Sequence, residues 1–160
     1  LGFSSAASDV YKRQYVHTID LSFMKEDKIM RDELINLDME KFIFTNGSAE
    51  HAENILSHLG VYDLFGRDKV FDIQDAGYVP KPEAKTFDLM LNKFKINPKE
   101  TIYIEDIAKN LGIGHERGCY TVWLINDEHF GKIDSNKDYI SHKIENLSLF
   151  LKEIRLLKNK

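Results

Sequence analysis

The sequence predicts an α/β protein, a Rossmann-like three-layer α/β/α fold built on a mostly parallel sheet. Strand-like and helix-like segments alternate from Lys41 to the C-terminus, and this alternation predicts right-handed βαβ units. The run YTVWLI at 120–125 is mostly apolar, as expected of a parallel strand covered on both faces. The segments between the strands carry apolar residues at helical spacing, which predicts amphipathic helices that cover the sheet.

The first half of the chain predicts two helices and two strands. Residues 25–38 place apolar residues among charges and predict a weakly amphipathic helix. Residues 41–45, KFIFT, predict a short strand that ends at the following Asn-Gly pair. Ser48 is a suitable N-cap for a second helix, and Gly60 ends that helix. Residues 70–73 predict the next strand.

The second half alternates more regularly between the two kinds of segment. A loop with one glycine and two prolines leads into it, and a glycine after the second of its helices is a typical C-terminal stop. The last strand is short and is expected at an edge of the sheet. The predicted elements are a helix at 83–95, a strand at 101–104, a helix at 107–118, a strand at 120–125, an edge strand at 139–144 and a helix at 146–157.

Composition excludes several classes of protein. Lys and Arg number 22 and Asp and Glu number 26, so the net charge is −4, without the basic excess of a nucleic-acid binder. No apolar run approaches the roughly 18 residues that a membrane span needs. Cys119 is the single cysteine, so no disulfide can form within the chain, and we expect a cytoplasmic setting.

The first residues differ from the rest of the chain. Residues 1–14 have no clear periodicity and lack the cationic-then-apolar layout of a signal peptide. The string SSAASDVYKRQ resembles translated adaptor sequence, so we interpret 1–14 as a non-native or disordered leader; a floppy native N-terminus is the alternative. The predicted domain, a partial core, covers 15–160.

Polar residues follow the first two predicted strands, at the sheet edge where ligands of parallel sheets collect. Thr45, Asn46 and Gly47 offer a hydroxyl, an amide and backbone N–H groups at a helix N-terminus, which suits a phosphate group. Lys81 lies between two prolines, and a held ammonium can neutralise a phosphoryl group during its transfer. Taken singly, these features equally fit ordinary helix capping and a surface lysine.

Two adjacent acids follow the third predicted strand. Glu105 and Asp106 are hard oxygen ligands suited to Mg²⁺, which favours one or two carboxylates together with substrate phosphate. Asn110 is four residues beyond Asp106, so in a continuous helix it would lie one turn away and orient that carboxylate. The alternative is that both acids stabilise the N-terminus of the following helix.

The order of these motifs resembles the haloacid dehalogenase-like hydrolase superfamily. TNGS matches its second motif, Lys81-Pro82 its third and IEDIAKNL its fourth, and the resemblance covers roughly residues 15–155. Within the superfamily, the segments FTNGSAEHAENILSHLGV, YVPKPEAKTFDLML and IEDIAKNLGIGHERGCYTV look most like bacterial pyrimidine 5′-nucleotidases. The acidic pair favours phosphate chemistry over carbon–halogen chemistry.

The resemblance implies Mg²⁺-dependent hydrolysis of a phosphate monoester, a nucleoside monophosphate, through an aspartyl-phosphate. Thr45, Asn46 and Gly47 would bind the phosphoryl group, with Thr45 and Lys81 as catalytic residues and Lys81 stabilising the charge. Asp106 would ligate Mg²⁺, and Glu105 would reach the metal directly or through water. Neither a nucleic-acid polymer nor a membrane is expected as a partner.

One family motif is missing. The nucleophile of the family is the first Asp of an Asp-x-Asp pair, and no such pair occurs in these 160 residues. Asp20, in TIDLS, is the nearest acid, with Ser22 where the second Asp would stand, and this segment looks like the return from the family's cap domain. The resemblance therefore implies a core without its first central strand and without most of the cap, inactive as written, with the edges of strands 41–45 and 101–104 unpaired.

Two other functions stay open. The first is a different reaction of the same superfamily, such as a sugar-phosphate phosphatase or a phosphoglucomutase. The second is a module that binds phosphate or metal without catalysis and has no nucleophile.

Overall fold

Five short strands, all paired in parallel, form the centre of the part of the chain that the structure describes. In the smaller sheet β1 (Ile43–Phe44) pairs with β2 (Val70–Phe71). In the larger sheet β4 (Tyr120–Leu124) lies between β3 (Ile102–Glu105) and β5 (His142–Ile144). The α/β class and the parallel pairing predicted from the sequence are confirmed, and β5 is an edge strand as expected.

The structure is a computed structural model that describes residues 25–158. Three predictions lie outside the described residues: the leader at 1–14, the domain start at Tyr15, and the return segment at 18–22 that contains Asp20 and Ser22.

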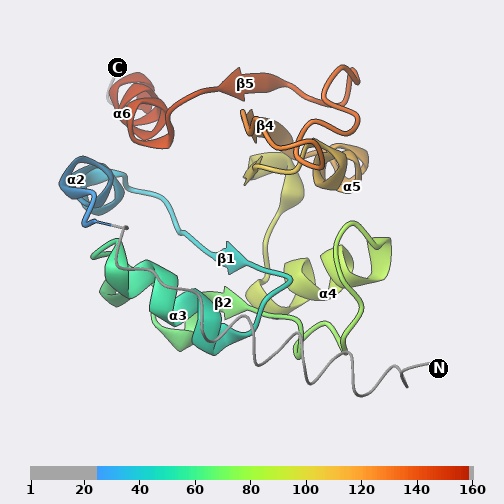
Figure 1. The fold of residues 1–160 in the computed structure, drawn as a ribbon, viewed down its shortest axis with the longest axis horizontal. Coiled ribbons are helices and arrows are strands. Elements are labelled where there is room, and N and C mark those ends of the chain that lie inside the picture. The colour runs from blue at the N-terminus through green and yellow to red at the C-terminus, as the bar shows by residue number, and fades with distance from the viewer. Residues whose placement is uncertain (1–24, 159–160) are drawn as a thin grey trace.

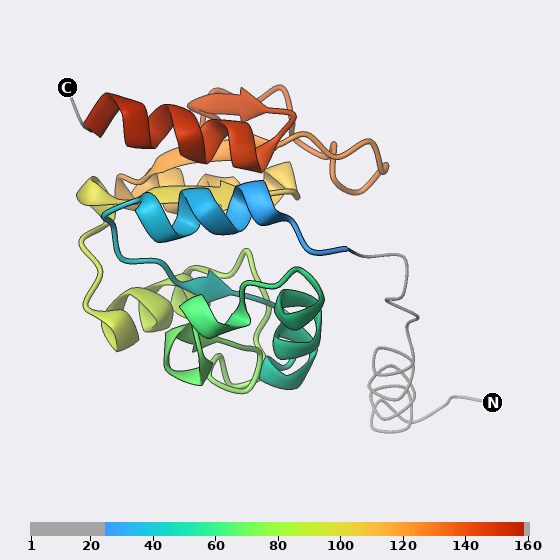
Figure 2. The same ribbon diagram turned by 90° about the vertical axis from the view of Figure 1, so that its left-hand side faces the viewer.

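The helices cover the strands on two sides, which gives three layers. Helices α2, α3 and α6 lie on one side and α4 and α5 on the other, with the strands between them (Figure 1). α2 and α6 pack side by side across one face of the larger sheet (Figure 2). The helices are α2 (Lys28–Asn36), α3 (Ala49–His58), α4 (Ala84–Phe94), α5 (Leu111–Arg117) and α6 (Leu147–Lys158).

The two sheets are not joined by a strand in the described part of the chain. β1 pairs only with β2 and β3 only with β4, so β1 and β3 are the strands that face each other across the middle of the molecule (Figures 1 and 2). The prediction that these two strands lack a partner on their inner sides is therefore confirmed for residues 25–158. Unpaired strand edges are a weak point of any sheet, because their N–H and C=O groups lack ladder partners.

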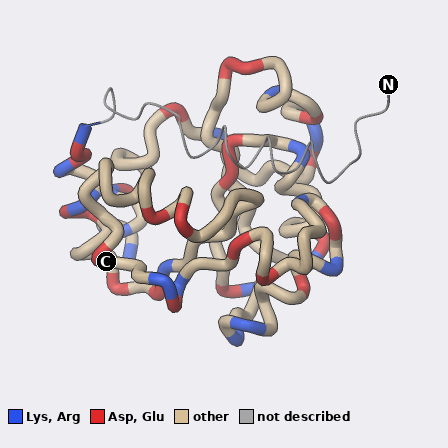
Figure 3. The backbone as a smooth tube through the Cα atoms, turned by 60° about the horizontal axis from the view of Figure 1, so that its bottom comes forward, with Lys and Arg blue, Asp and Glu red and all other residues tan. Residues whose placement is uncertain are grey.

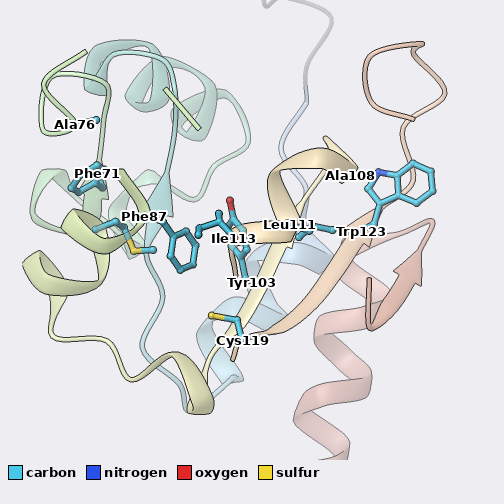
Figure 4. Close-up of a cluster of buried hydrophobic side chains, with 10 residues drawn as sticks. Phe71, Ala76, Phe87, Tyr103, Ala108, Leu111, Ile113, Cys119 and Trp123 are labelled. Carbon is cyan, nitrogen blue, oxygen red and sulfur yellow. The ribbon is translucent and has the colours of Figure 1, made fainter. Parts of the chain in front are cut away.

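Aromatic side chains pack across the interval between the sheets. The ring of Tyr103 on β3 lies 5.2 Å from the ring of Phe87 on α4 and 6.4 Å from that of Phe44 on β1, measured between centroids. Figure 4 shows this cluster running from Phe71 in the smaller sheet to Trp123 in the larger one. Between β1 and β3 the hydrophobic core is therefore continuous, although no backbone hydrogen bonds join these two strands into one sheet.

The helix termini follow the sequence signals, with one exception. Ser48 caps α3, its Oγ accepting a hydrogen bond from the N–H of His51 at 3.2 Å, and Gly118 ends α5 with a φ of 95° that L-residues rarely adopt. The prediction of one continuous helix over 107–118 is wrong at its start. Ile107 is extended and a 3₁₀ turn, Ala108–Asn110, precedes α5, because the chain must turn sharply after β3.

Charged residues of both signs are mixed over the described chain. Figure 3 shows Lys and Arg interspersed with Asp and Glu along the trace. No helix among the described residues is long and apolar enough to cross a membrane. Cys119 is buried, and burial raises the pKa of its thiol to about 11, so the thiol is protonated at neutral pH.

Candidate active site

The loop after β1 presents a hydroxyl and backbone donors at the N-terminus of α3. The N–H of Thr45 continues the β1–β2 ladder by donating to the carbonyl of Phe71 at 3.0 Å. The N–H of Gly47 donates to Thr45 Oγ1 at 2.9 Å, which closes a tight turn. Asn46, at the tip of this turn, is exposed. A short turn of this kind before a helix N-terminus is chemically suited to an anion.

Asp72, which the sequence reasoning did not single out, anchors this loop from the position directly after β2. The residue is only 1% exposed, and its Oδ2 accepts from the N–H of Ala49, in the first turn of α3, at 2.9 Å. Its Oδ1 accepts from the N–H groups of Gln74 and Asp75 at 3.0 and 2.9 Å. One carboxylate therefore ties the start of α3 to the turn after β2. The sequence does show an acid directly after the apolar pair Val-Phe, which could have marked Asp72 as a residue at a strand end. The strand predicted at 70–73 included this position, so the acid was not recognised.

Lys81 reaches the same loop from the segment before α4. Its backbone N–H donates to Asn46 Oδ1 at 2.7 Å, and its Nζ donates to the carbonyl oxygen of Phe44 at 2.9 Å. The ammonium lies 4.8 Å from the centre of the Phe44 ring, a favourable cation–π distance. It also forms an ion pair with Glu105 Oε1, in which the Lys81 side chain is 9% exposed and that of Glu105 is 6% exposed. A cation is thus held at the end of β1 by partners from both sheets.

Tyr103 supplies a second contact to the carboxylate of Glu105. Its hydroxyl donates to Glu105 Oε1 at 3.0 Å, because residues two apart in a strand point to the same face of the sheet. Burial first, and then the neighbouring Glu105 charge and this hydrogen bond, hold the pKa of the Tyr103 phenol well above its usual value of 10.0. The phenol is therefore a neutral donor at physiological pH.

Asp106 lies apart from Glu105 although the two are adjacent in sequence. Asp106 is exposed, and its Oδ2 accepts from Asn126 Nδ2 at 3.3 Å. Its backbone carbonyl accepts from Trp123 Nε1 at 3.0 Å, so Trp123 supports this turn as well as packing in the core. Successive side chains at a strand end point in different directions, which separates the two carboxylates.

The described residues do not make a complete metal site. No group of three or more His, Cys, Asp or Glu side chains is placed to hold a metal ion in residues 25–158. Glu105 Oε1 is engaged by Lys81 and Tyr103, which leaves Asp106 as the exposed carboxylate after β3. Mg²⁺ needs several oxygen ligands around it. Further ligands would have to come from water, from substrate or from residues beyond the described ones.

The structure brings most of the predicted site residues together. Thr45, Asn46, Gly47, Lys81 and Glu105 meet where β1 and β3 end. Asp106 lies at the end of β3 but bonds to the loop after β4. The predicted helical geometry between Asp106 and Asn110 is wrong, because the first residues after β3 are not α-helical; Asn110 is buried at the start of α5, and it is Asn126 that contacts the Asp106 carboxylate.

Comparison with known families agrees with this arrangement. The family model for haloacid dehalogenase-like hydrolases matches residues 28–116, more than half of the chain and the part that holds the loop after β1, Lys81, Glu105 and Asp106. These residues lie at the carboxyl ends of parallel strands in an α/β core. The chain belongs to the haloacid dehalogenase-like hydrolase family.

Solved structures with the same fold are longer than this chain. A haloacid dehalogenase-like protein from Agrobacterium tumefaciens matches with a TM-score of 0.66 at 15% identity, over 98% of this chain and 72% of that one. L-2-haloacid dehalogenase from Xanthobacter autotrophicus matches at 0.60 and 15%, over 78% and 59%. β-Phosphoglucomutase from Clostridium difficile matches at 0.59 and 17%, over 94% and 65%. The chain thus spans about six tenths of the dehalogenase.

Proposed function

We propose that the whole protein hydrolyses phosphate monoesters with Mg²⁺ as cofactor, and that its substrates are pyrimidine nucleoside monophosphates. The observation that carries the proposal is the position of Lys81, whose ammonium and backbone N–H are both bonded at the turn after β1. A fixed cation beside a hydroxyl and a helix N-terminus is suited to a phosphoryl group in which charge develops during transfer. The pyrimidine preference rests on the similarity in amino-acid sequence between the three motif segments and bacterial pyrimidine 5′-nucleotidases.

Each residue of the site has a defined part in the proposed reaction. The Thr45 hydroxyl and the Asn46 amide would donate to phosphoryl oxygens, and Lys81 would offset the charge that the transition state spreads over them. The first aspartate of the family's Asp-x-Asp pair would attack phosphorus while the second donates a proton to the departing ester oxygen, and water would then hydrolyse the acyl phosphate. This chain holds no Asp-x-Asp pair, so in the proposal the nucleophile comes from another segment of the whole protein.

Asp106 is the proposed protein ligand for Mg²⁺ within the described residues. When bound, the metal would neutralise phosphate charge. The described residues supply a single exposed carboxylate at this position. A cytoplasmic setting remains part of the proposal, because the one cysteine is a buried thiol and free nucleotides are cytoplasmic metabolites.

Inorganic phosphate is expected to bind this chain through Lys81. The Lys81→Gln variant should bind phosphate at least about tenfold more weakly, because a hydrogen bond to a charged group contributes about 1.5–3 kcal/mol. Titration followed by ³¹P NMR measures the affinity. Lys85→Gln, an exposed lysine in the first turn of α4, is the matched control and should bind as the unmodified chain does.

A second variant tests the phosphate site in case Lys81→Gln does not fold. Thr45→Val removes the hydroxyl at a half-buried position outside the ion pair, and it too should weaken phosphate binding. Equal phosphate affinity for the unmodified chain, Lys81→Gln and Thr45→Val, with all three folded, would contradict the proposed phosphate site.

The purified 160-residue chain is expected to release no phosphate from UMP in the presence of Mg²⁺. The physical reason is the absence of the carboxylate pair that would attack phosphorus and protonate the leaving group. A phosphate-release assay against a longer gene product that carries an Asp-x-Asp strand is the comparison. Turnover by the 160-residue chain would show that another group performs the attack.

A substrate panel on the longer gene product separates the remaining enzyme candidates. Preference for sugar phosphates, or phosphoryl transfer between positions of a sugar, would favour a sugar-phosphate phosphatase or a phosphoglucomutase; the phosphoglucomutase structure that matches this chain shares its fold. A module that binds phosphate without catalysis is the second candidate. The observation that favours it is the intact loop and lysine beside a missing nucleophile.

A further inference from the structure

One oxygen atom, Glu105 Oε1, connects the cation of the site to a buried tyrosine. The ammonium of Lys81 contacts this oxygen, and the hydroxyl of Tyr103 donates to it at 3.0 Å. A lysine ammonium has three N–H donors, and the bonds to Glu105 and to the carbonyl of Phe44 use two of them. The orientation of the third donor, which a ligand would receive, is then set by where Glu105 Oε1 lies.

The ring of Tyr103 is held firmly by its neighbours. It packs edge-on against Phe87, at 5.2 Å between centroids, and is 8% exposed. On its other side it lies against α5 at Gly114, where an added Cβ would come within 2.5 Å of Tyr103 Cδ1. No real Cβ contact is that short, so the glycine is what lets the ring approach the helix. Figure 4 shows Tyr103 near Phe87, with Ile113 and Leu111 of α5 beside it.

We propose that Tyr103 is a positioning residue for the active site, which fixes the direction of the Lys81 ammonium by holding Glu105 Oε1. The chain of contacts is short and continuous: Gly114 seats the Tyr103 ring, the ring places its hydroxyl, and the hydroxyl fixes the carboxylate that Lys81 contacts. The phenol touches no substrate in this arrangement and acts through Glu105. The inference rests on the proposed function only in assigning the third Lys81 donor to a phosphate ligand.

The geometry also gives Glu105 a role different from that of Asp106. A carboxylate oxygen that accepts from both an ammonium and a phenol is stabilised where it lies, in a site that is 7% exposed as a residue. Moving Glu105 onto a metal would leave the Lys81 ammonium and the Tyr103 hydroxyl without this acceptor in a poorly hydrated place. Glu105 is therefore the partner of Lys81 in this site.

The test measures the Lys81 ammonium directly, by ¹⁵N NMR of lysine NH₃⁺ groups in the full chain. The Lys81 signal is assigned from its loss in Lys81→Gln. Tyr103→Phe removes only the hydroxyl and keeps the ring packing, so it should speed hydrogen exchange of the Lys81 ammonium roughly two- to tenfold, the range that a net hydrogen bond corresponds to. The exposed Lys85 is the internal reference and should not change.

Gly114→Ala and Gly112→Ala form a matched pair on α5. Gly114→Ala should displace the Tyr103 ring and speed Lys81 exchange as Tyr103→Phe does, and the two changes combined should not add. The nearest atom to a Cβ on Gly112 is in the Tyr139 ring at 3.5 Å, an ordinary contact, so Gly112→Ala should leave Lys81 unchanged. If Gly114→Ala does not fold, Tyr103→Phe alone decides.

Three outcomes of these measurements have different meanings. Unchanged exchange at Lys81 in Tyr103→Phe overturns the inference, whatever happens to phosphate binding. Faster exchange in Tyr103→Phe, with phosphate binding and the melting temperature unchanged, supports the positioning of Lys81 by Tyr103 and counts against the proposed phosphate role of Lys81. Faster exchange together with weaker phosphate binding supports both.

Discussion

Replacing Glu105 by glutamine is expected to lower the free energy of unfolding by about 3–5 kcal/mol, the loss typical of removing one partner from a buried ion pair. The Lys81 ammonium would keep the carbonyl of Phe44 but lose its only anionic contact among the described hydrogen bonds and ion pairs. Both side chains of the pair are less than 10% exposed, so water would replace the lost carboxylate poorly. Urea denaturation followed by circular dichroism measures the change.

Two comparison variants make this prediction specific. Glu116→Gln makes the same chemical change at an exposed side chain on α5, and it should alter stability by less than about 0.5 kcal/mol. The double variant Lys81→Met with Glu105→Leu replaces the buried pair by apolar groups and should recover much of the lost stability. A Glu105→Gln chain as stable as the unmodified one would mean that the pair is not formed as described.

Replacing Asp72 by alanine is expected to cost about 3 kcal/mol. The carboxylate accepts from three backbone N–H groups, those of Ala49, Gln74 and Asp75, and no other group in the variant would replace it for all three. Arg67, whose Nη2 lies 3.6 Å from Asp72 Oδ2, would also lose a partner. Thermal and urea denaturation would report the loss.

The change at Asp72 should also reach the active site. Since Asp72 ties the start of α3 to β2, its loss frees the turn that contains Thr45 and Gly47, and the affinity for inorganic phosphate should fall. Asp68→Ala, at an exposed acid on the 3₁₀ turn before β2, is the matched control and should change neither property. Destabilisation without weaker phosphate binding would limit the role of Asp72 to the fold.

Glu105 joins the two halves of the molecule, and its large expected effect follows from the way the sheet is divided, whereas Asp72 joins α3 to the turn after β2 within one half. β1 and β3 carry no strand between them in the described chain, so side chains join the two halves. Among them are the Tyr103–Phe87 and Tyr103–Phe44 ring contacts, the Lys81–Glu105 pair and the apolar cluster that includes Leu151 of α6 and Leu56 of α3. A strand between β1 and β3 would join the two halves through many backbone hydrogen bonds. Here side-chain contacts take the place of those bonds, and we expect the loss of a buried ion pair among them to have a large effect.

Local periodicity in the sequence determined the kind and order of the elements. Alternating helical and strand-like runs correctly predicted the strands at Ile43–Phe44 and Tyr120–Leu124 and the helix at Ala84–Phe94, because side-chain spacing along a helix or strand depends only on near neighbours. The boundaries were less accurate. The 3₁₀ turn Ala108–Asn110 replaced the expected start of a helix, since the chain after β3 turns to fit against the loop that contains Gly131, whose carbonyl accepts from Ala108 N.

The sequence alone also determined which chemical groups are present: a Thr-Asn-Gly turn, a lysine between prolines, an acidic pair after a strand, and no Asp-x-Asp pair. Only the tertiary structure decided how these groups are partnered. Lys81 bonds to residues 37 and 24 positions away, Phe44 and Glu105, and no local pattern encodes a pairing over such distances. The separation of Glu105 from Asp106, the hydroxyl of Tyr103 on Glu105 and the anchoring by Asp72 arise from packing between elements, which a one-dimensional pattern does not contain.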